Sequence, residues 1–241
     1  MIEPRPASFR SPEPRLVAWS RGQALTMLSG VSACAGLRAH ASEHPEGFAW
    51  PVAAGATLSF LCLLALGRGA FTPSGRFGLA NAVTSLRLAL VLLLCAPPAR
   101  LQTNAELALV LSVLALDVLD GWLARRRGDA SAFGGHFDLE TDALLVLLVT
   151  LRLWLAHGFA AWVLFAGVLR YAYVLWLWLW PGTGREAPRS RWGRYSFVLL
   201  MLGLCVGLGL PGVWGKLAVC LGTLVVSVSF ARSVYFSRLA S

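Results

Sequence analysis

The chain has 241 residues, of which 57% are hydrophobic and only 14% are charged, and its mean hydropathy is +0.66. Such values argue against an ordinary soluble domain. The net charge of +9 does not indicate nucleic-acid binding, because the basic residues lie between apolar runs, where they would face anionic lipid headgroups.

Several apolar runs approach the roughly 20 residues that a helix needs to cross a bilayer. Lipid cannot satisfy backbone hydrogen bonds, so spanning segments must be helices or a closed barrel, and the period-two alternation of a barrel is absent. In chain order, the sequence predicts eight spans at residues 22–38, 50–66, 84–98, 105–124, 138–157, 159–180, 195–211 and 215–231. The first is diluted by Gln23 and Thr26, and an amphipathic helix on the membrane surface is its alternative. We therefore expect an all-α, polytopic transmembrane helical bundle.

The distribution of basic residues predicts which side of the membrane each loop faces. One set of loops carries most of the arginines, and the opposite loops carry only Arg100 and Lys216. With eight spans, the N-terminal arginines join the larger set, which we expect in the cytoplasm: Arg5, Arg10, Arg15, Arg68, Arg76, residues 125–127, Arg185, Arg189, Arg191, Arg194, Arg232 and Arg238. Residues 1–21 are then a cytoplasmic tail.

Six of the twelve acidic residues fall between positions 117 and 142. A carboxylate inside a membrane span is costly unless it is paired, so it marks a functional site. Asp117 and Asp120 are three residues apart and share one helical face, and Asp138 and Asp142 are four apart and do likewise. Four converging carboxylates need cations between them, and ligation by oxygen alone favours magnesium or manganese. Pairing with the arginines at 125–127, or helix capping by Asp138, would not explain two acid pairs within spans.

These aspartates belong to a longer pattern, D-x2-D-G-x2-A-R-x8-G-x3-D-x3-D, which runs from Asp117 to Asp142. The pattern matches the signature of the CDP-alcohol phosphatidyltransferase family without a gap or substitution, and the chain resembles this family. Its fixed positions are Asp117, Asp120, Gly121, Ala124, Arg125, Gly134, Asp138 and Asp142. One helix earlier, Asn81, Thr84 and Arg87 form the N-x2-T-x2-R pattern of the family's first core helix, although polar residues there would also fit simple capping.

The resemblance covers residues 78–235 as a six-helix catalytic core, with residues 22–77 as additional N-terminal membrane helices. It implies that Asp117, Asp120, Asp138 and Asp142 bind two Mg²⁺ or Mn²⁺ ions and that Asp142 is also the general base. It further implies contacts with the CDP part of the donor from Asn81, Thr84, Gly121, Arg125 and Ser131.

The reaction implied by the resemblance belongs to phospholipid biosynthesis. A phosphatidyl group moves from a CDP-alcohol such as CDP-diacylglycerol to the hydroxyl of a small alcohol, and CMP is released. We expect this chemistry at the cytoplasmic face of the cell (inner) membrane. The resemblance also favours a homodimer.

Two residues outside the signature have open roles. Arg170 lies in the middle of a span, where a guanidinium needs a partner or a polar cavity. It either neutralises the aspartate cluster or binds an anionic group on the acceptor together with Arg194. Glu140 lies between Asp138 and Asp142, points away from both on a helix, and is expected outside the metal site.

Other functions compete with the transferase. In a transporter the carboxylates would form an ion or proton site, and a non-catalytic membrane scaffold is a third option. The chain has no repeated half, and transport does not require the glycines and arginine of the signature. The sequence does not identify the acceptor, because glycerol 3-phosphate, inositol, inositol phosphate and serine are all used within the family.

Overall fold

The computed structural model describes residues 14–40, 49–69, 71–72, 74–97, 101–127, 131–180, 191–210 and 212–239. These residues form eight α-helices and one short 3-10 helix, and no strand occurs among them. The helices are α1 (Pro14–His40), α2 (Trp50–Leu66), α3 (Leu79–Leu93), α4 (Thr103–Arg127), α5 (Ala132–Ala156), η2 (Ala161–Val163), α6 (Leu164–Leu179), α7 (Arg191–Gly209) and α8 (Val213–Leu239). The all-α bundle expected from the sequence is confirmed, with one helix for each predicted span.

Several helix boundaries differ from the expected ones. α1 begins at Pro14 and therefore includes residues 14–21, which the sequence places in the tail. α5 begins at Ala132, because the Ser131 hydroxyl caps it by accepting a hydrogen bond from the Gly134 amide at 2.9 Å. The suggestion that Asp138 caps this helix was wrong, since Asp138 lies in the second turn.

The membrane character of the chain is clearest in its C-terminal third. Three segments are long and apolar enough to cross a membrane by length and composition: Ala161–Leu179, Trp192–Gly209 and Val213–Tyr235. Two more helices, α2 and α3, are apolar but shorter, with 17 and 15 residues. Large apolar side chains on α8, among them Val213, Trp214 and Val228, are exposed. Such a bundle fits a multi-pass membrane protein, in which lipid covers the apolar outer surface.

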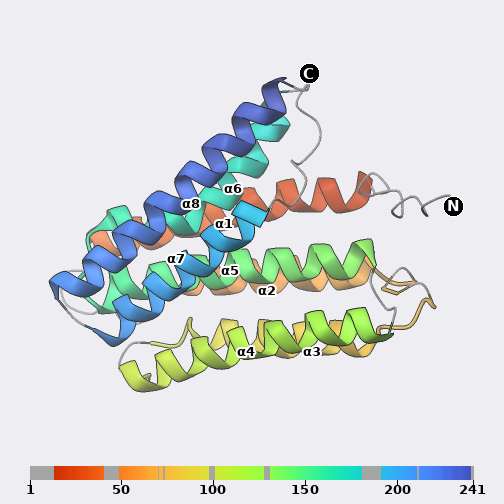
Figure 1. Ribbon diagram of the computed structural model, residues 1–241, viewed down its shortest axis with the longest axis horizontal. Coiled ribbons are helices and arrows are strands. Elements are labelled where there is room, and N and C mark those ends of the chain that lie inside the picture. The colour runs from red at the N-terminus through yellow and green to blue at the C-terminus, as the bar shows by residue number, and fades with distance from the viewer. Residues whose placement is uncertain are drawn as a thin grey trace, which may run out of the picture.

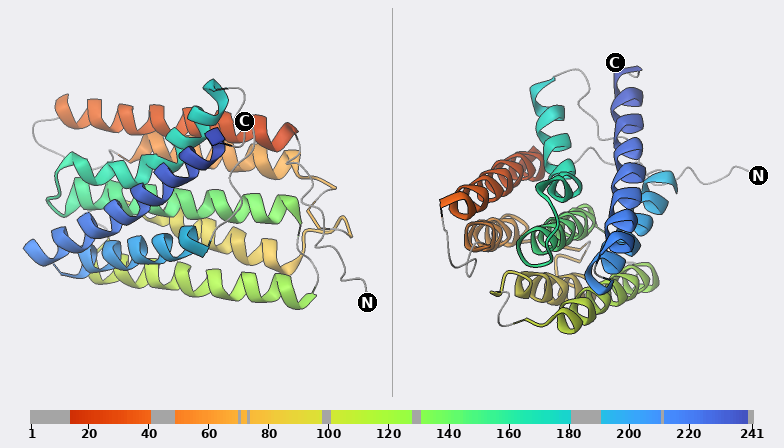
Figure 2. Two further views of the ribbon diagram at one scale, coloured as in Figure 1. Left: turned by 45° about the horizontal axis from the view of Figure 1, so that its top comes forward. Right: turned by 90° about the vertical axis from the view of Figure 1, so that its left-hand side faces the viewer.

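The centre of the bundle is α5, whose residues 143–153 are all buried. In Figure 1, α2, α3, α4 and α5 run nearly parallel or antiparallel, and α8 crosses them obliquely. The right-hand view in Figure 2 looks along the bundle and shows α3 and α4 below α5, with α1 and α2 on one side and α7 and α8 on the other. Side chains on α5 can therefore contact partners on most of the other helices.

The first helix packs against α2 and α6 and runs along the bundle rather than across its end (Figure 2). Near its start, the Ser20 hydroxyl is 2.8 Å from Nε2 of His136. Near its end, Arg38 donates a 2.6 Å hydrogen bond to the Trp154 carbonyl and stacks over the same tryptophan, 4.5 Å from the ring centre. These contacts tie α1 to both ends of α5. α1 is not among the helices that meet the length and hydropathy of a membrane span.

Glycine allows α6 to pack closely on α5. A Cβ added at Gly167 would lie 2.3 Å from the Thr150 hydroxyl and 2.9 Å from Cα of Leu147. Small residues have this function at membrane helix interfaces, where close approach of the backbones supplies the packing energy.

A second buried ionic cluster joins α4 to α5 at the end of the bundle remote from the signature aspartates. Glu106 contacts the Arg152 guanidinium, and its other oxygen is 2.6 Å from Nε2 of His157. Arg152 also donates a 2.7 Å hydrogen bond to the Ala96 carbonyl. Sequence reasoning did not single out this cluster, because its members are about 50 residues apart and match no motif.

Candidate active site

The four signature aspartates converge from two helices. Asp117 and Asp120 lie in the last third of α4, and Asp138 and Asp142 lie in the first half of α5. The carboxylates of Asp117, Asp120 and Asp138 offer oxygen atoms that all lie within 4.8 Å of one another. The convergence expected from the three- and four-residue spacings is therefore present.

A single arginine from α3 contacts all four carboxylates. Nη1 of Arg87 is 3.0 Å from Asp117, 2.8 Å from Asp120 and 2.6 Å from Asp138. Nη2 of the same guanidinium contacts Asp142. The Arg87 side chain is 0% exposed, so these carboxylates provide the partners that a cation inside a membrane protein requires. In sequence, Arg87 was only the last member of a family pattern.

The aspartates differ in how far they reach the surface. The exposed fraction of the side chain is 35% for Asp117, 32% for Asp138 and 20% for Asp142, but only 7% for Asp120. Because Arg87 is fully buried, it lies on the inner side of the cluster, and the carboxylates are accessible from the opposite side.

The donor set fits a hard divalent cation. Carboxylate oxygens within a few ångströms of one another are the ligands that Mg²⁺ and Mn²⁺ prefer. Each contact with Arg87 uses one oxygen atom of its carboxylate, namely Oδ1 of Asp117, Asp138 and Asp142 and Oδ2 of Asp120.

Two residues expected to contact CDP lie on α3, and one of them, Thr84, contacts an aspartate. The Thr84 hydroxyl lies 3.0 Å from Oδ2 of Asp120 and 3.1 Å from the Ala80 carbonyl, and it can donate to either. Asn81 donates from Nδ2 to the carbonyls of Phe71 and Phe77, at 3.1 and 2.7 Å. Asn81 and Thr84 are each only 3% exposed.

Ser131, the third such residue, lies close to Asn81. Its hydroxyl donates a 2.6 Å hydrogen bond to the same Phe71 carbonyl that accepts from Asn81. A Cβ added at Gly134 would lie 2.9 Å from Oδ1 of Asn81 and 3.2 Å from the Ser131 hydroxyl. The glycine of the signature therefore has a packing role, since it leaves room for Asn81.

The remaining signature positions follow on α4. Gly121 comes directly after Asp120, and Arg125 lies one turn beyond it. The Arg125 side chain lies outside the described part of the structure, and so do Asp129, Arg185 and Arg189.

Arg170 on α6 does not neutralise the aspartate cluster. Its Nη2 is 2.9 Å from Oε1 of Glu140, which is 1% exposed. Glu140 is two residues from both Asp138 and Asp142, a rotation of about 200° on a helix, and so lies on the other face of α5. The interpretation of Arg170 as a neutraliser of the aspartates was wrong, whereas the expectation that Glu140 points away from them is confirmed.

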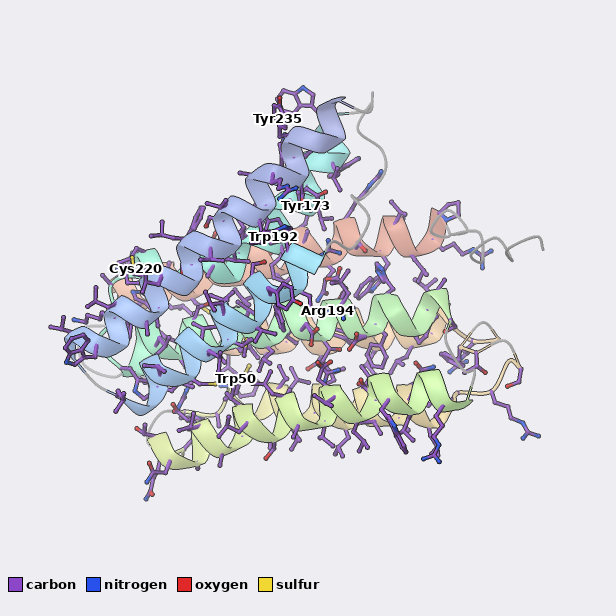
Figure 3. The ribbon with its side chains drawn as sticks, in the orientation of Figure 1. Trp50, Tyr173, Trp192, Arg194, Cys220 and Tyr235 are labelled. Atoms are coloured by element: carbon purple, nitrogen blue, oxygen red, sulfur yellow. The ribbon has the colours of Figure 1, made fainter. Side chains whose placement is uncertain are left out.

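Arg194 is not buried with Arg170. It lies in the first turn of α7 near Trp192 (Figure 3). Both side chains are exposed. The expectation that Arg170 and Arg194 hold an anionic acceptor together therefore loses its main support, because Arg170 already has a carboxylate partner.

Comparison with known proteins agrees with the geometry of the site. The family model for CDP-alcohol phosphatidyltransferases matches residues 77–231, which include the whole of α3 to α7 and most of α8. The chain belongs to the CDP-alcohol phosphatidyltransferase family, whose members transfer a phosphate-linked group from a CDP-alcohol. No curated protein and no solved structure matches the chain. The match leaves α1 and α2 outside the family region.

Proposed function

We propose that the protein transfers a phosphatidyl group from CDP-diacylglycerol, or a similar CDP-linked lipid, to the hydroxyl of a small alcohol and releases CMP, as a step of phospholipid biosynthesis. The observation that supports this most is that the four signature aspartates of α4 and α5 converge, and all of them contact Arg87 of α3. A membrane-embedded site suits a donor with a nucleotide head and a lipid tail.

In this proposal, Asp117, Asp120, Asp138 and Asp142 hold two Mg²⁺ or Mn²⁺ ions. Bound there, the ions would neutralise the diphosphate of the donor and the negative charge that develops on the departing CMP. The partial exposure of three of these carboxylates leaves them accessible from the outer side of the cluster.

Asp142 is the proposed general base. It accepts the proton of the acceptor hydroxyl, and that oxygen attacks the lipid-side phosphorus. The bond between this phosphorus and the bridging oxygen of the diphosphate breaks, which gives a phosphodiester lipid and CMP. Asp138 has a comparable position beside Arg87, so the choice of Asp142 depends on its place as the last aspartate of the signature.

The donor's CDP part is proposed to contact Asn81, Thr84, Gly121, Arg125 and Ser131. Asn81 and Ser131 share the Phe71 carbonyl and lie beside Gly134, and Thr84 contacts Asp120. The five positions thus lie on three neighbouring elements around the aspartates. We also propose, from the family resemblance, that the protein is a homodimer.

We further propose that the end of the bundle with the aspartates faces the cytoplasm, in the cell (inner) membrane. Arg68, Arg76 and Arg126 belong to the connections and helix ends nearest the aspartates, as the positive-inside rule expects. CMP would then leave on the side where nucleotides are made.

The test is direct. Purified protein is incubated with CDP-diacylglycerol and a panel of acceptors: glycerol 3-phosphate, inositol, inositol phosphate and serine. CMP release is quantified, and the lipid products are identified by mass spectrometry. CMP should be released when one of these acceptors is present, and the lipid product should contain that acceptor in a phosphodiester. No CMP release with any alcohol would favour the transporter interpretation, in which the carboxylates bind a transported ion.

A further inference from the structure

Arg87 reaches the aspartates from inside the bundle, where solvent cannot. Its side chain is 0% exposed, and its two terminal nitrogens contact one oxygen from each of four carboxylates. Metal ions and substrate must approach from the opposite, accessible side. Arg87 is therefore a positioning residue, which acts on the site through the aspartates.

Charge explains why such a residue is needed. Four carboxylates brought together in a low dielectric repel one another, and without a cation among them they would protonate or move apart. A guanidinium has donors spread over a planar fork and can serve several carboxylates at once, which the single ammonium of lysine cannot do as well. Its one positive charge, however, also repels any metal ion that binds to the same carboxylates.

We propose that Arg87 is the internal counter-ion of the aspartate cluster: it keeps the four carboxylates together in the metal-free protein and, by its charge, lowers their affinity for divalent cations. This inference depends on the metal site of the proposed function. If Arg87 has this role, the loss of stability on removing it should be smaller when metal is bound. Bound metal ions would then neutralise the carboxylates in its place.

A matched control exists in Arg170 of α6, which pairs with a carboxylate on the other face of α5. Arg170 is also a poorly exposed arginine, with 12% of its side chain exposed, and pairs with Glu140 of α5 at 2.9 Å. Glu140 lies on the face of α5 opposite to Asp138 and Asp142. Loss of Arg170 should therefore destabilise the protein to the same extent with and without metal.

The experiment compares wild type, Arg87→Gln and Arg170→Gln in detergent, each in EDTA and in excess Mn²⁺. Thermal unfolding gives the Tm, and electron paramagnetic resonance of free Mn²⁺ gives the Kd. In EDTA, each variant should lose about 10 °C, as expected for breaking a buried ion pair. In Mn²⁺, the deficit of Arg87→Gln should shrink to less than half and that of Arg170→Gln should not change.

The Kd provides an independent measurement. By linkage, a protein that Mn²⁺ stabilises more must bind Mn²⁺ more tightly. We expect a Kd about tenfold lower for Arg87→Gln than for wild type, because one nearby positive charge has been removed. An unchanged or weaker affinity of Arg87→Gln for Mn²⁺ would overturn the counter-ion role. The same loss of Tm in EDTA and in Mn²⁺ for this variant would also overturn it.

The outcomes separate this inference from the function proposed above. If Mn²⁺ does not stabilise the wild type, the metal site itself fails, and the inference fails with it. If the wild type is stabilised but Arg87→Gln behaves like Arg170→Gln, the inference alone fails. CMP release by the wild type is measured separately and tests the reaction.

A second variant covers the case in which Arg87→Gln cannot be purified. Arg87→Lys keeps the positive charge but loses the fork, so we expect a loss of Tm in EDTA with a Mn²⁺ Kd within about threefold of wild type. A tenfold tighter Kd for Arg87→Lys would show that the charge of Arg87 does not oppose metal binding.

Discussion

Arg170 on α6 donates a hydrogen bond from Nη2 to Oε1 of Glu140 on α5, across 2.9 Å. Glu140 is 1% exposed, so this pair is shielded from solvent. The pair ties α6 to the face of α5 that points away from Asp138 and Asp142. It therefore links two helices of the bundle without belonging to the aspartate site.

Replacing Arg170 should thus affect stability rather than substrate binding. Breaking a buried pair by removing one partner leaves a buried charge, and we expect Arg170→Gln to lower the free energy of unfolding by about 3 kcal/mol. The KM for the acceptor should stay within about twofold of wild type. Thermal unfolding and steady-state kinetics with the identified acceptor measure both quantities, and a KM raised tenfold would restore an acceptor-binding role.

Asp142→Asn should nearly abolish turnover while the CDP-lipid still binds. General-base catalysis contributes about 100-fold or more, so a variant that keeps more than about a tenth of the rate would contradict the assignment. Glu140→Gln is the matched control on the other face of α5, and it should keep kcat within about threefold of wild type. CMP release and equilibrium binding of the CDP-lipid are the measurements.

Chelation should remove activity reversibly. Carboxylate ligands favour hard cations, so EDTA should stop CMP release and either Mg²⁺ or Mn²⁺ should restore it. Zn²⁺ should restore it poorly. Undiminished activity in EDTA, or a specific need for Zn²⁺, would count against the two-metal site.

Two adjacent glycines provide a test of the CDP contacts. A Cβ at Gly134 would lie 2.9 Å from Oδ1 of Asn81, whereas a Cβ at Gly135 would have no heavy atom within 4 Å. We expect Gly134→Ala to displace Asn81 and to raise the KM for the CDP-lipid about tenfold or more. Gly135→Ala should leave it near the wild-type value. Equal effects of the two substitutions would mean that the position of Asn81 is not critical for donor binding.

Labelling of introduced cysteines should reveal the orientation in the membrane. Arg127 ends α4 near the aspartates, and Gln102 directly precedes the same helix at its other end. After removal of the native cysteines, Arg127→Cys should resist a membrane-impermeant maleimide added to intact cells, and Gln102→Cys should react. The reverse pattern would place the site on the outer side.

Local sequence determines most of the helical architecture, because a long apolar run can satisfy its backbone in lipid only as a helix. Each of the eight predicted spans is a helix in the structure, and the errors are confined to their ends. At α5 the predicted span begins at residue 138, whereas the helix begins at Ala132 with Ser131 as its N-cap.

The convergence of the aspartates was also predictable from spacing. Residues three or four apart share a helical face, so Asp117 and Asp120 form one pair and Asp138 and Asp142 form another. Two successive helices joined by a short loop then bring the pairs together.

Only the tertiary structure decided which arginine pairs with which carboxylate. The sequence left Arg170 as a candidate partner of the aspartates, but Arg87 occupies that position, 33 residues from Asp120 and 55 from Asp142. Arg170 pairs instead with Glu140, 30 residues away. Helical periodicity specifies which side chains share a face of one helix, but it carries no information on which faces of different helices meet, because that depends on the packing of the whole bundle.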